Sequence, residues 1–227
     1  MIAITSFSPK GYEVYGKKFL ESAADYWPTK IVAYVEEPMQ DDDQVSYKLL
    51  SEVYGLSAFL EYCNSNPVFR GCVGQGYNYN FDAAKFANKA FAQFDAQKYT
   101  GKVFWLDADL VFKKPVTTEF LEDLFDNHTI CALQRPGMYT ESGFLGFDTD
   151  RGDFKTFLTE YINVYRKGKL FQLRGWHDCY ALDYAIERSG VLVKNLSPDF
   201  PKNGINVMPH SVLGEYVIHN KGDRKYK

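Results

Sequence analysis

Residues 103–115 read VFWLDADLVFKKP, and this stretch decides which fold the sequence predicts. Its first four residues are apolar and predict a short strand that is buried on both faces. Asp107 and Asp109 follow, and apolar residues then resume. Two carboxylates held inside a fold are unfavourable unless a cation compensates their charge. Because open α/β sheets bind ligands at the carboxyl ends of inner strands, the pair predicts a site for Mn²⁺ or Mg²⁺ bound together with phosphates. The alternative is a strand that ends in a solvated Asp-x-Asp turn.

The composition is that of an ordinary globular domain. The chain has 227 residues, of which 45% are hydrophobic and 24% are charged, so one domain with one substantial core is expected. A formal charge of −3 gives no electrostatic signal for non-specific nucleic-acid binding. The four cysteines lack CxxC pairing, and no segment approaches the ~18 apolar residues of a transmembrane helix. We therefore expect a cytoplasmic protein without a leader or membrane anchor, and a bacterial or viral origin fits best.

Periodic patterns around this stretch predict strands that alternate with helices. Residues 1–7 have the composition of a strand, whereas residues 79–97 carry apolar side chains at helical spacing. Residues 45–62 are expected to form one or two helices, and residues 64–79 are expected to form a loop. The loop after the first strand contains neither GxGxxG nor GxxxxGK[ST], which argues against a Rossmann dehydrogenase and a P-loop NTPase.

The string FWLDADLVFKKP resembles the DxD segment of GT-A-fold glycosyltransferases, in which this motif holds a divalent cation on the diphosphate of a nucleotide sugar. The resemblance implies an α/β fold, with a central, mostly parallel sheet flanked by helices in a single GT-A (nucleotide-diphospho-sugar transferase) domain over residues 1–227. Residues 1–112 would form its nucleotide-binding half and residues 113–227 its acceptor-side half. The implied activity is metal-dependent sugar transfer, of the hexosyltransferase class, from a nucleotide-diphosphate sugar, above all a UDP-sugar. The acceptor stays open among a glycan, a lipid, a protein and a modified DNA base.

Residues 219–222, HNKG, resemble the last element of metal-dependent GT-A enzymes. In that element a histidine is the third protein ligand of the cation and a lysine contacts a phosphate. The resemblance therefore implies Asp107, Asp109 and His219 as ligands of Mn²⁺ or Mg²⁺. It also implies that both Asp107 and Lys221 bind the donor. The motif order is nearest to that of family 8-like enzymes, but the spacing departs from their HxxGxxKPW form. Which basic residue contacts the diphosphate therefore stays open. For the later basic residues Arg224, Lys225 and Lys227, the alternative is a solvated, frayed tail.

Further donor-binding candidates follow from the same resemblance. In GT-A enzymes the loop after the first strand commonly meets the base and the ribose, which implies Thr5, Ser6 and Phe7. A basic residue on the helix before the DxD strand often reaches the diphosphate or the donor sugar. The AAKF string makes Lys85 the candidate for this role, whereas Lys89 is expected to be a solvated lysine. The alternative is that both lysines are solvated.

Residues 135–149, RPGMYTESGFLGFDT, resemble the GT-A strand that lies beside the donor sugar and opens towards the acceptor. Glu141, Ser142 and Gly143 would line that pocket, and the alternative is an edge hairpin with ordinary glycine turns. In the RGWHD sequence, Asp178 is either a carboxylate at a helix N-terminus without a catalytic role or a general base or ligand of sugar hydroxyls. If the reaction inverts, Asp178 or Glu141 would deprotonate the acceptor. If it retains, no enzymic base is required.

Two rival functions stay open. A sugar-nucleotide nucleotidyltransferase shares a related fold and a metal-bound carboxylate. Its Gly-rich, Arg-containing loop is not supplied by the SFSPKGYEVYG sequence around the end of the first strand. A non-catalytic carbohydrate-binding protein of the GT-A fold would keep the architecture and lose turnover. The DxD pair and the C-terminal histidine argue against this second rival.

Overall fold

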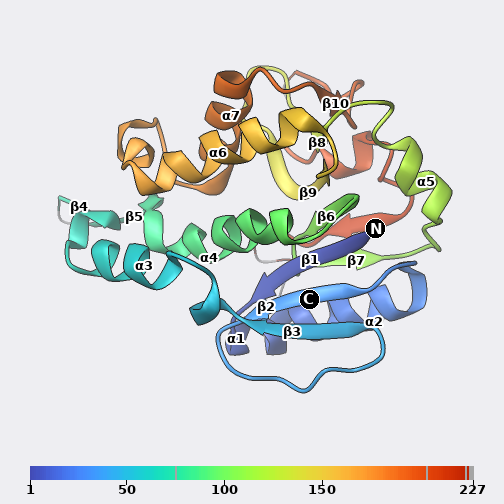
Figure 1. Cartoon of the computed structure of the whole chain (residues 1–227), viewed down its shortest axis with the longest axis horizontal. Coiled ribbons are helices and arrows are strands. Elements are labelled where there is room, and N and C mark those ends of the chain that lie inside the picture. The colour runs from blue at the N-terminus through green and yellow to red at the C-terminus, as the bar shows by residue number, and fades with distance from the viewer. Residues whose placement is uncertain (75, 203, 223, 225–227) are drawn as a thin grey trace.

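The computed structural model describes residues 1–74, 76–202, 204–222 and 224 of the chain. Its centre is a seven-stranded sheet in the order β10-β8-β9-β6-β1-β2-β3 (Figure 1). Only β9 runs against its neighbours β6 and β8; the other pairs in the sheet are parallel. The predicted mostly parallel α/β sheet is therefore confirmed. The seven strands are β1 (Ile2–Phe7), β2 (Ile31–Val35), β3 (Val45–Leu49), β6 (Lys102–Leu106), β8 (Ile130–Leu133), β9 (Glu141–Asp148) and β10 (Val193–Asn195).

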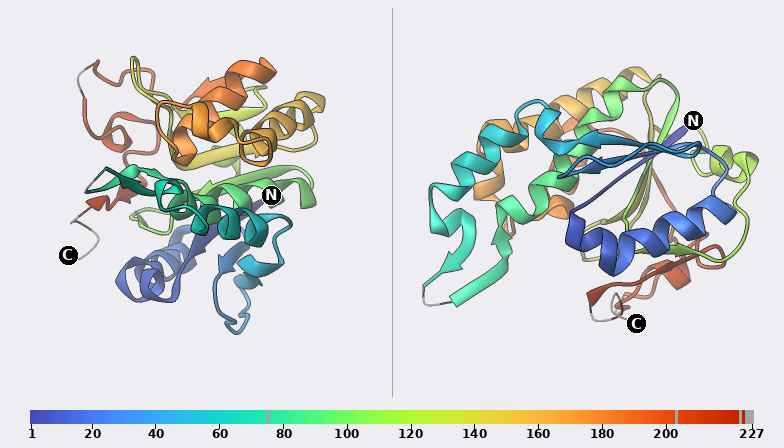
Figure 2. Two further views of the ribbon diagram at one scale, coloured as in Figure 1. Left: turned by 90° about the vertical axis from the view of Figure 1, so that its left-hand side faces the viewer. Right: turned by 90° about the horizontal axis from the view of Figure 1, so that it is seen from below.

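Helices cover both faces of this sheet (Figure 2). One face packs against α3 (Leu56–Asn64), α4 (Ala83–Phe94), α6 (Gly152–Arg166) and α7 (Asp178–Ser189). The opposite face packs against α2 (Lys17–Tyr26), α5 (Thr118–Asp123) and the antiparallel pair β7 (Leu110–Phe112) and β11 (Val217–His219). Short helical segments lie at α1 (Pro9–Gly11) and, as 3₁₀ turns, at Leu50–Glu52, Pro67–Phe69, Asp95–Lys98, Lys169–Gln172 and Met208–His210.

The apolar run at residues 103–106 forms the inner strand β6, as its composition predicts. Side chains alternate along a strand, so Val103 and Trp105 pack into the core beneath α4, while Phe104 and Leu106 pack into the core on the α2 face. All four are essentially inaccessible to solvent. A strand buried on both faces needs apolar side chains at every position, which is the physical reason for the continuous run.

The predicted helix over residues 79–97 is confirmed as α4, with shorter bounds. The carboxylate of Asp82 accepts the backbone N–H of Lys85 at 3.2 Å and caps the first turn. Ala84, Ala87 and Phe91 are buried on the face that packs into the core, as the helical spacing indicates.

Two expectations from the sequence and one alternative were wrong. Residues 45–49, expected to be helical, form the edge strand β3, because pairing with β2 satisfies backbone groups that β2 would otherwise leave exposed. The expected loop at residues 64–79 contains most of a hairpin of β4 (Arg70–Val73) and β5 (Gly76–Asp82), which projects from the body of the molecule (Figure 2). The alternative of an edge hairpin at residues 135–149 is also wrong, since β9 is central and lies between β6 and β8.

The sheet topology brings distant parts of the chain to the end of β6. The backbone N–H of Asp107 donates to the carbonyl of Gly143 at 2.9 Å, so the DxD segment is fixed beside β9. On its other side, β11 pairs with β7 in a register that sets His219 opposite Leu110. No helix within the described ranges is both long and apolar enough to cross a membrane.

Candidate active site

The three predicted metal ligands meet at the carboxyl end of β6. His219 Nε2 lies 2.9 Å from Asp109 Oδ1 and 3.6 Å from Asp107 Oδ2. Asp109 and His219 are buried, whereas the Asp107 side chain is 22% exposed. The cluster therefore has two buried members and one that reaches the surface, which gives a ligand access to it.

The donor set of this cluster fits a divalent cation. Oxygen and imidazole ligands together suit Mn²⁺ better than Mg²⁺, which prefers oxygen alone. One ligand atom each from Asp107, Glu141 and His219 lies within 4.8 Å of the others. Although His219 Nε2 is close to Asp109, it has no hydrogen-bond partner in the described part of the chain. Glu141, which the sequence analysis expected to be catalytic, thus lies beside the predicted metal ligands Asp107 and His219.

Gly143 makes this approach possible, because its hydrogen atom faces the imidazole. A Cβ at this position would lie 2.9 Å from His219 Nδ1 and 3.2 Å from Asp107 Oδ2, and closer still to His219 Cε1. Real Cβ atoms essentially never lie within 3.0 Å of another side chain, so a larger residue would have to displace the imidazole. The resemblance placed Gly143 in the donor pocket; in the structure it supplies the space in which the side chains of the predicted ligands converge.

A second cluster is centred on Lys89, which extends from α4. Its Nζ atom lies 2.7 Å from Asp107 Oδ1, 3.0 Å from Asp178 Oδ2 and 2.9 Å from Ser142 Oγ. The ammonium group also lies over the ring of Trp105, 5.6 Å from its centroid. The prediction that Lys89 is a solvated lysine was therefore wrong, since it joins the DxD segment to β9 and α7.

The charges of this second cluster stabilise one another. Burial alone would lower the pKa of Lys89, but the carboxylates of Asp107 and Asp178 raise it well above its usual value. Burial would likewise raise the pKa of Asp178, but Lys89 and the hydroxyl of Ser142 hold that pKa below its usual range. Asp178 thus stays ionised. Because a carboxylate with a depressed pKa is a weak base, Asp178 is better suited to accept hydrogen bonds than to act as a general base.

Glu141 is held by two cations from different parts of the chain. Its Oε2 atom pairs with Lys221 and lies 3.6 Å from a guanidinium nitrogen of Arg135. Burial would raise the pKa of Glu141, but Lys221, His219 and Arg135 together keep it below the usual value. Arg135 was not predicted; its presence in the stretch that begins RPGMYTESG was the only sequence signal.

The remaining candidates lie around these clusters rather than in them. Lys85 is exposed, and its Nζ atom lies 5.6 Å from the ring centroid of Tyr79 rather than at the carboxylates. Thr5 is fully buried in β1, Ser6 is half-buried, and Phe7 lines a cavity of about 190 Å³ at the ends of β1 and β2. Their roles in donor binding stay predictions. Lys225 and Lys227 lie outside the described residues.

Two solved structures with a similar fold are glycosyltransferases. The bifunctional glycosyltransferase WbbM superposes with a TM-score of 0.53 at 14% identity, covering 98% of this chain and 46% of its own. Mouse xyloside xylosyltransferase 1 also gives a TM-score of 0.53, at 12% identity, covering 87% of this chain and 86% of its own. The chain has the GT-A glycosyltransferase fold. The fold implied by the DxD resemblance is therefore confirmed.

No family model and no curated protein sequence matches the chain. This chain spans less than half the length of WbbM and most of the length of the mouse enzyme. At such low identities the likeness establishes the fold alone. The activity of this chain therefore has to be argued from its own side chains.

Proposed function

We propose that the chain is a metal-dependent glycosyltransferase that moves a sugar from a nucleotide-diphosphate donor to an acceptor. The observation that supports this function best is the convergence of Asp107, Asp109 and His219 at the carboxyl end of β6. This is the edge at which an open α/β sheet receives its ligands, and the sheet is of the GT-A type. We also propose a cytoplasmic location. It is supported by the four cysteines, which are free and of which three are buried, because unpaired thiols are typical of a reducing compartment.

Asp107 is oriented for metal binding by the chain itself. Its Oδ1 atom accepts a hydrogen bond from Trp105 Nε1 at 2.8 Å and pairs with Lys89, which leaves Oδ2 on the side of His219. Mn²⁺, or Mg²⁺, held by Asp107, Asp109 and His219 would offset the negative charge that develops on the nucleotide diphosphate as the sugar–phosphate bond breaks. Lys221 would add positive charge once a phosphate competes with Glu141 for its ammonium group.

The donor's base fits the small cavity lined by Phe7 and Tyr12. The two rings are 5.7 Å apart at their centroids and contact each other, and aromatic side chains favour an aromatic ligand packed against them. We expect a UDP-sugar, with Ser6 at the ribose.

The donor sugar would lie between this cavity and β9, beside Ser142, Glu141 and Asp178. Because both carboxylates have depressed pKa values, we assign them to accepting hydrogen bonds from sugar hydroxyls. Lys89 then acts as a positioning residue, since it holds Asp107, Ser142 and Asp178 in one arrangement.

Donor hydrolysis in the absence of an acceptor tests this function. UDP-, GDP-, ADP- and CMP-sugars are incubated with Mn²⁺ and the wild type, Asp109→Asn or Asp123→Asn, and nucleotide release is measured. We expect slow, Mn²⁺-dependent release from one donor, reduced about a hundredfold or more in Asp109→Asn. Asp123 is exposed on α5, so its variant is the matched control and should equal the wild type. Absence of release from every donor, or equal release by Asp109→Asn, would overturn the proposal.

A further inference from the structure

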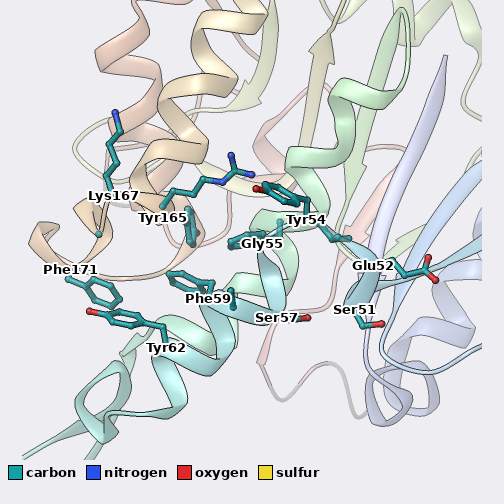
Figure 3. Close-up of a pocket in the computed structure, with 15 residues that line it drawn as sticks. Ser51, Glu52, Tyr54, Gly55, Ser57, Phe59, Tyr62, Tyr165, Lys167 and Phe171 are labelled. Atoms are coloured by element: carbon teal, nitrogen blue, oxygen red, sulfur yellow. The ribbon is translucent and has the colours of Figure 1, made fainter.

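A groove of about 920 Å³ lies outside the carboxylate clusters, between α3 and the C-terminal end of α6 (Figure 3). Its base is formed by Phe59 and Tyr165, both buried. Figure 3 shows Tyr62 and Phe171 at one end of the groove and Tyr54 towards the other. The volume lies within the range of about 300–1,000 Å³ that is usual for ligand pockets.

The groove presents aromatic rings to solvent. Tyr54 is 78% exposed and Tyr62 is 52% exposed. The ring of Tyr62 stacks on Phe69 with centroids 5.1 Å apart and meets Phe171 at 5.9 Å. At the other end, the guanidinium group of Arg166 lies 4.8 Å from the centroid of Tyr54. Exposed aromatic rings that are already packed on one side lose little side-chain entropy when a ligand covers the other.

The chain that borders this groove is strongly basic. Residues 166–174 read RKGKLFQLR and contain four basic and no acidic residues. Among the described residues, none of these four basic side chains forms an ion pair with a carboxylate. Glu52 borders the far end, but its side chain points away from the rings (Figure 3). The uncompensated positive charge favours a ligand that carries negative charge.

We propose that this groove binds an acidic saccharide chain. A sugar ring has an apolar C–H face that fits a tyrosine ring and polar edges that accept hydrogen bonds, so Tyr54 and Tyr62 would stack on sugar units. Carboxylate, sulfate or phosphate groups on the chain would pair with Arg166 and Lys167. A concave groove with a buried aromatic base suits a chain of sugar units better than the flat surface of a membrane.

Two elements of the fold connect the groove with the carboxylate clusters. Phe171 meets Trp176 edge-on at 5.1 Å, and Trp176 lies two residues before Asp178. Helix α4 carries Lys89 of the second cluster and also Phe91, which borders the groove. That the bound saccharide is the acceptor rests on the proposed transferase function; that it binds does not.

Calorimetric titration of the whole chain, without donor and without Mn²⁺, tests the binding. The ligands are an oligogalacturonate, a neutral malto-oligosaccharide of equal length, and vesicles of anionic phospholipid. We expect the oligogalacturonate alone to bind, and more weakly as the salt concentration rises. Tyr62→Ala should weaken this binding about tenfold, and Arg166→Ala should weaken it several-fold. Tyr62→Phe keeps the ring and should bind like the wild type. Arg188→Ala removes an exposed arginine from α7, outside the groove, and should have no effect.

Four outcomes would overturn the proposal. Binding of neither saccharide, or undiminished binding by Tyr62→Ala, would remove the groove as the site, and equal binding of both saccharides would remove its preference for acidic chains. Binding of the vesicles instead would assign the basic segment to a lipid surface. The titration contains no donor, and the donor hydrolysis assay contains no acceptor. A negative result in one assay therefore does not decide the result of the other.

Discussion

The two oxygens of the Asp107 carboxylate face different environments. On one side, Oδ1 pairs with Lys89, which also holds Asp178, so the chain itself supplies the compensating cation. On the other side, Oδ2 faces the imidazole of His219, next to Asp109. The first arrangement is complete once the protein has folded, whereas the second brings together ligands suited to an added cation. The difference shows how one oxygen of a single carboxylate contributes to stability while the other faces the proposed metal site.

Replacement of Lys89 should have the largest effect, because it removes the cation that compensates the charges of Asp107 and Asp178. Lys89→Met leaves the buried carboxylate of Asp178 without its cation, and we expect the free energy of unfolding to fall by about 3–5 kcal/mol. Urea denaturation measures this change. Lys85→Met, at an exposed position on the same helix, is the matched control and should stay within about 0.5 kcal/mol of the wild type. Equal losses in both variants would show that the Lys89 contacts contribute no special stability.

Addition of Mn²⁺ sharpens the comparison from the other side. At a concentration a hundredfold above its Kd, Mn²⁺ should stabilise the wild type by about 2.7 kcal/mol, because it binds the folded state. Asp109→Asn should lose this stabilisation, whereas Asp123→Asn should keep it. Denaturation with and without Mn²⁺ provides the readout. If Asp109→Asn were stabilised as strongly as the wild type, the cation would have to bind elsewhere.

Gly143→Ala tests whether the close approach of His219 matters. The added methyl group would meet the imidazole and Asp107, and forcing it in should cost about 1–3 kcal/mol of unfolding free energy and weaken the stabilisation by Mn²⁺. Gly152→Ala is the control, since a Cβ there meets nothing within 4 Å. Both are measured by denaturation with and without Mn²⁺. An unchanged response to Mn²⁺ in Gly143→Ala would mean that the imidazole is not a ligand.

Ser142→Ala should have the smallest effect, and the effect should depend on pH. The lost hydrogen bond to Asp178 should lower the unfolding free energy by about 1 kcal/mol at neutral pH. Because the folded-state pKa of Asp178 is depressed, this contribution is present above the unfolded pKa of about 3.9 and is lost as the pH falls through the folded pKa. The difference between variant and wild type should therefore shrink in acid. Denaturation at a series of pH values checks this, and a difference that is constant with pH would contradict the link to the Asp178 charge.

The sequence predicted the central strand and the carboxylate pair at its end because both signals are local. A continuous apolar run can be satisfied only by a strand that is covered on both faces, and the two carboxylates directly follow it. The same local reasoning failed at residues 45–49, where pairing with β2 outweighed the apparent helical pattern. It failed again at residues 64–79, where short polar strands pair with each other and carry no strong apolar alternation.

By itself, the sequence determined that the chain folds around β6 and that a carboxylate pair stands at its end. The choice of lysine was decided only by tertiary structure: Lys85 and Lys89 lie one turn apart, and the packing of α4 over Trp105 selects Lys89. The pairing of β11 with β7 likewise brings His219 to Asp109, and the position of β9 beside β6 brings Gly143 and Glu141 there. A sequence pattern predicts the apolar face of a helix or strand, because side chains follow one another at fixed spacings along these elements. Which buried groups meet depends on contacts between elements far apart in the chain, and these exist only in the folded protein.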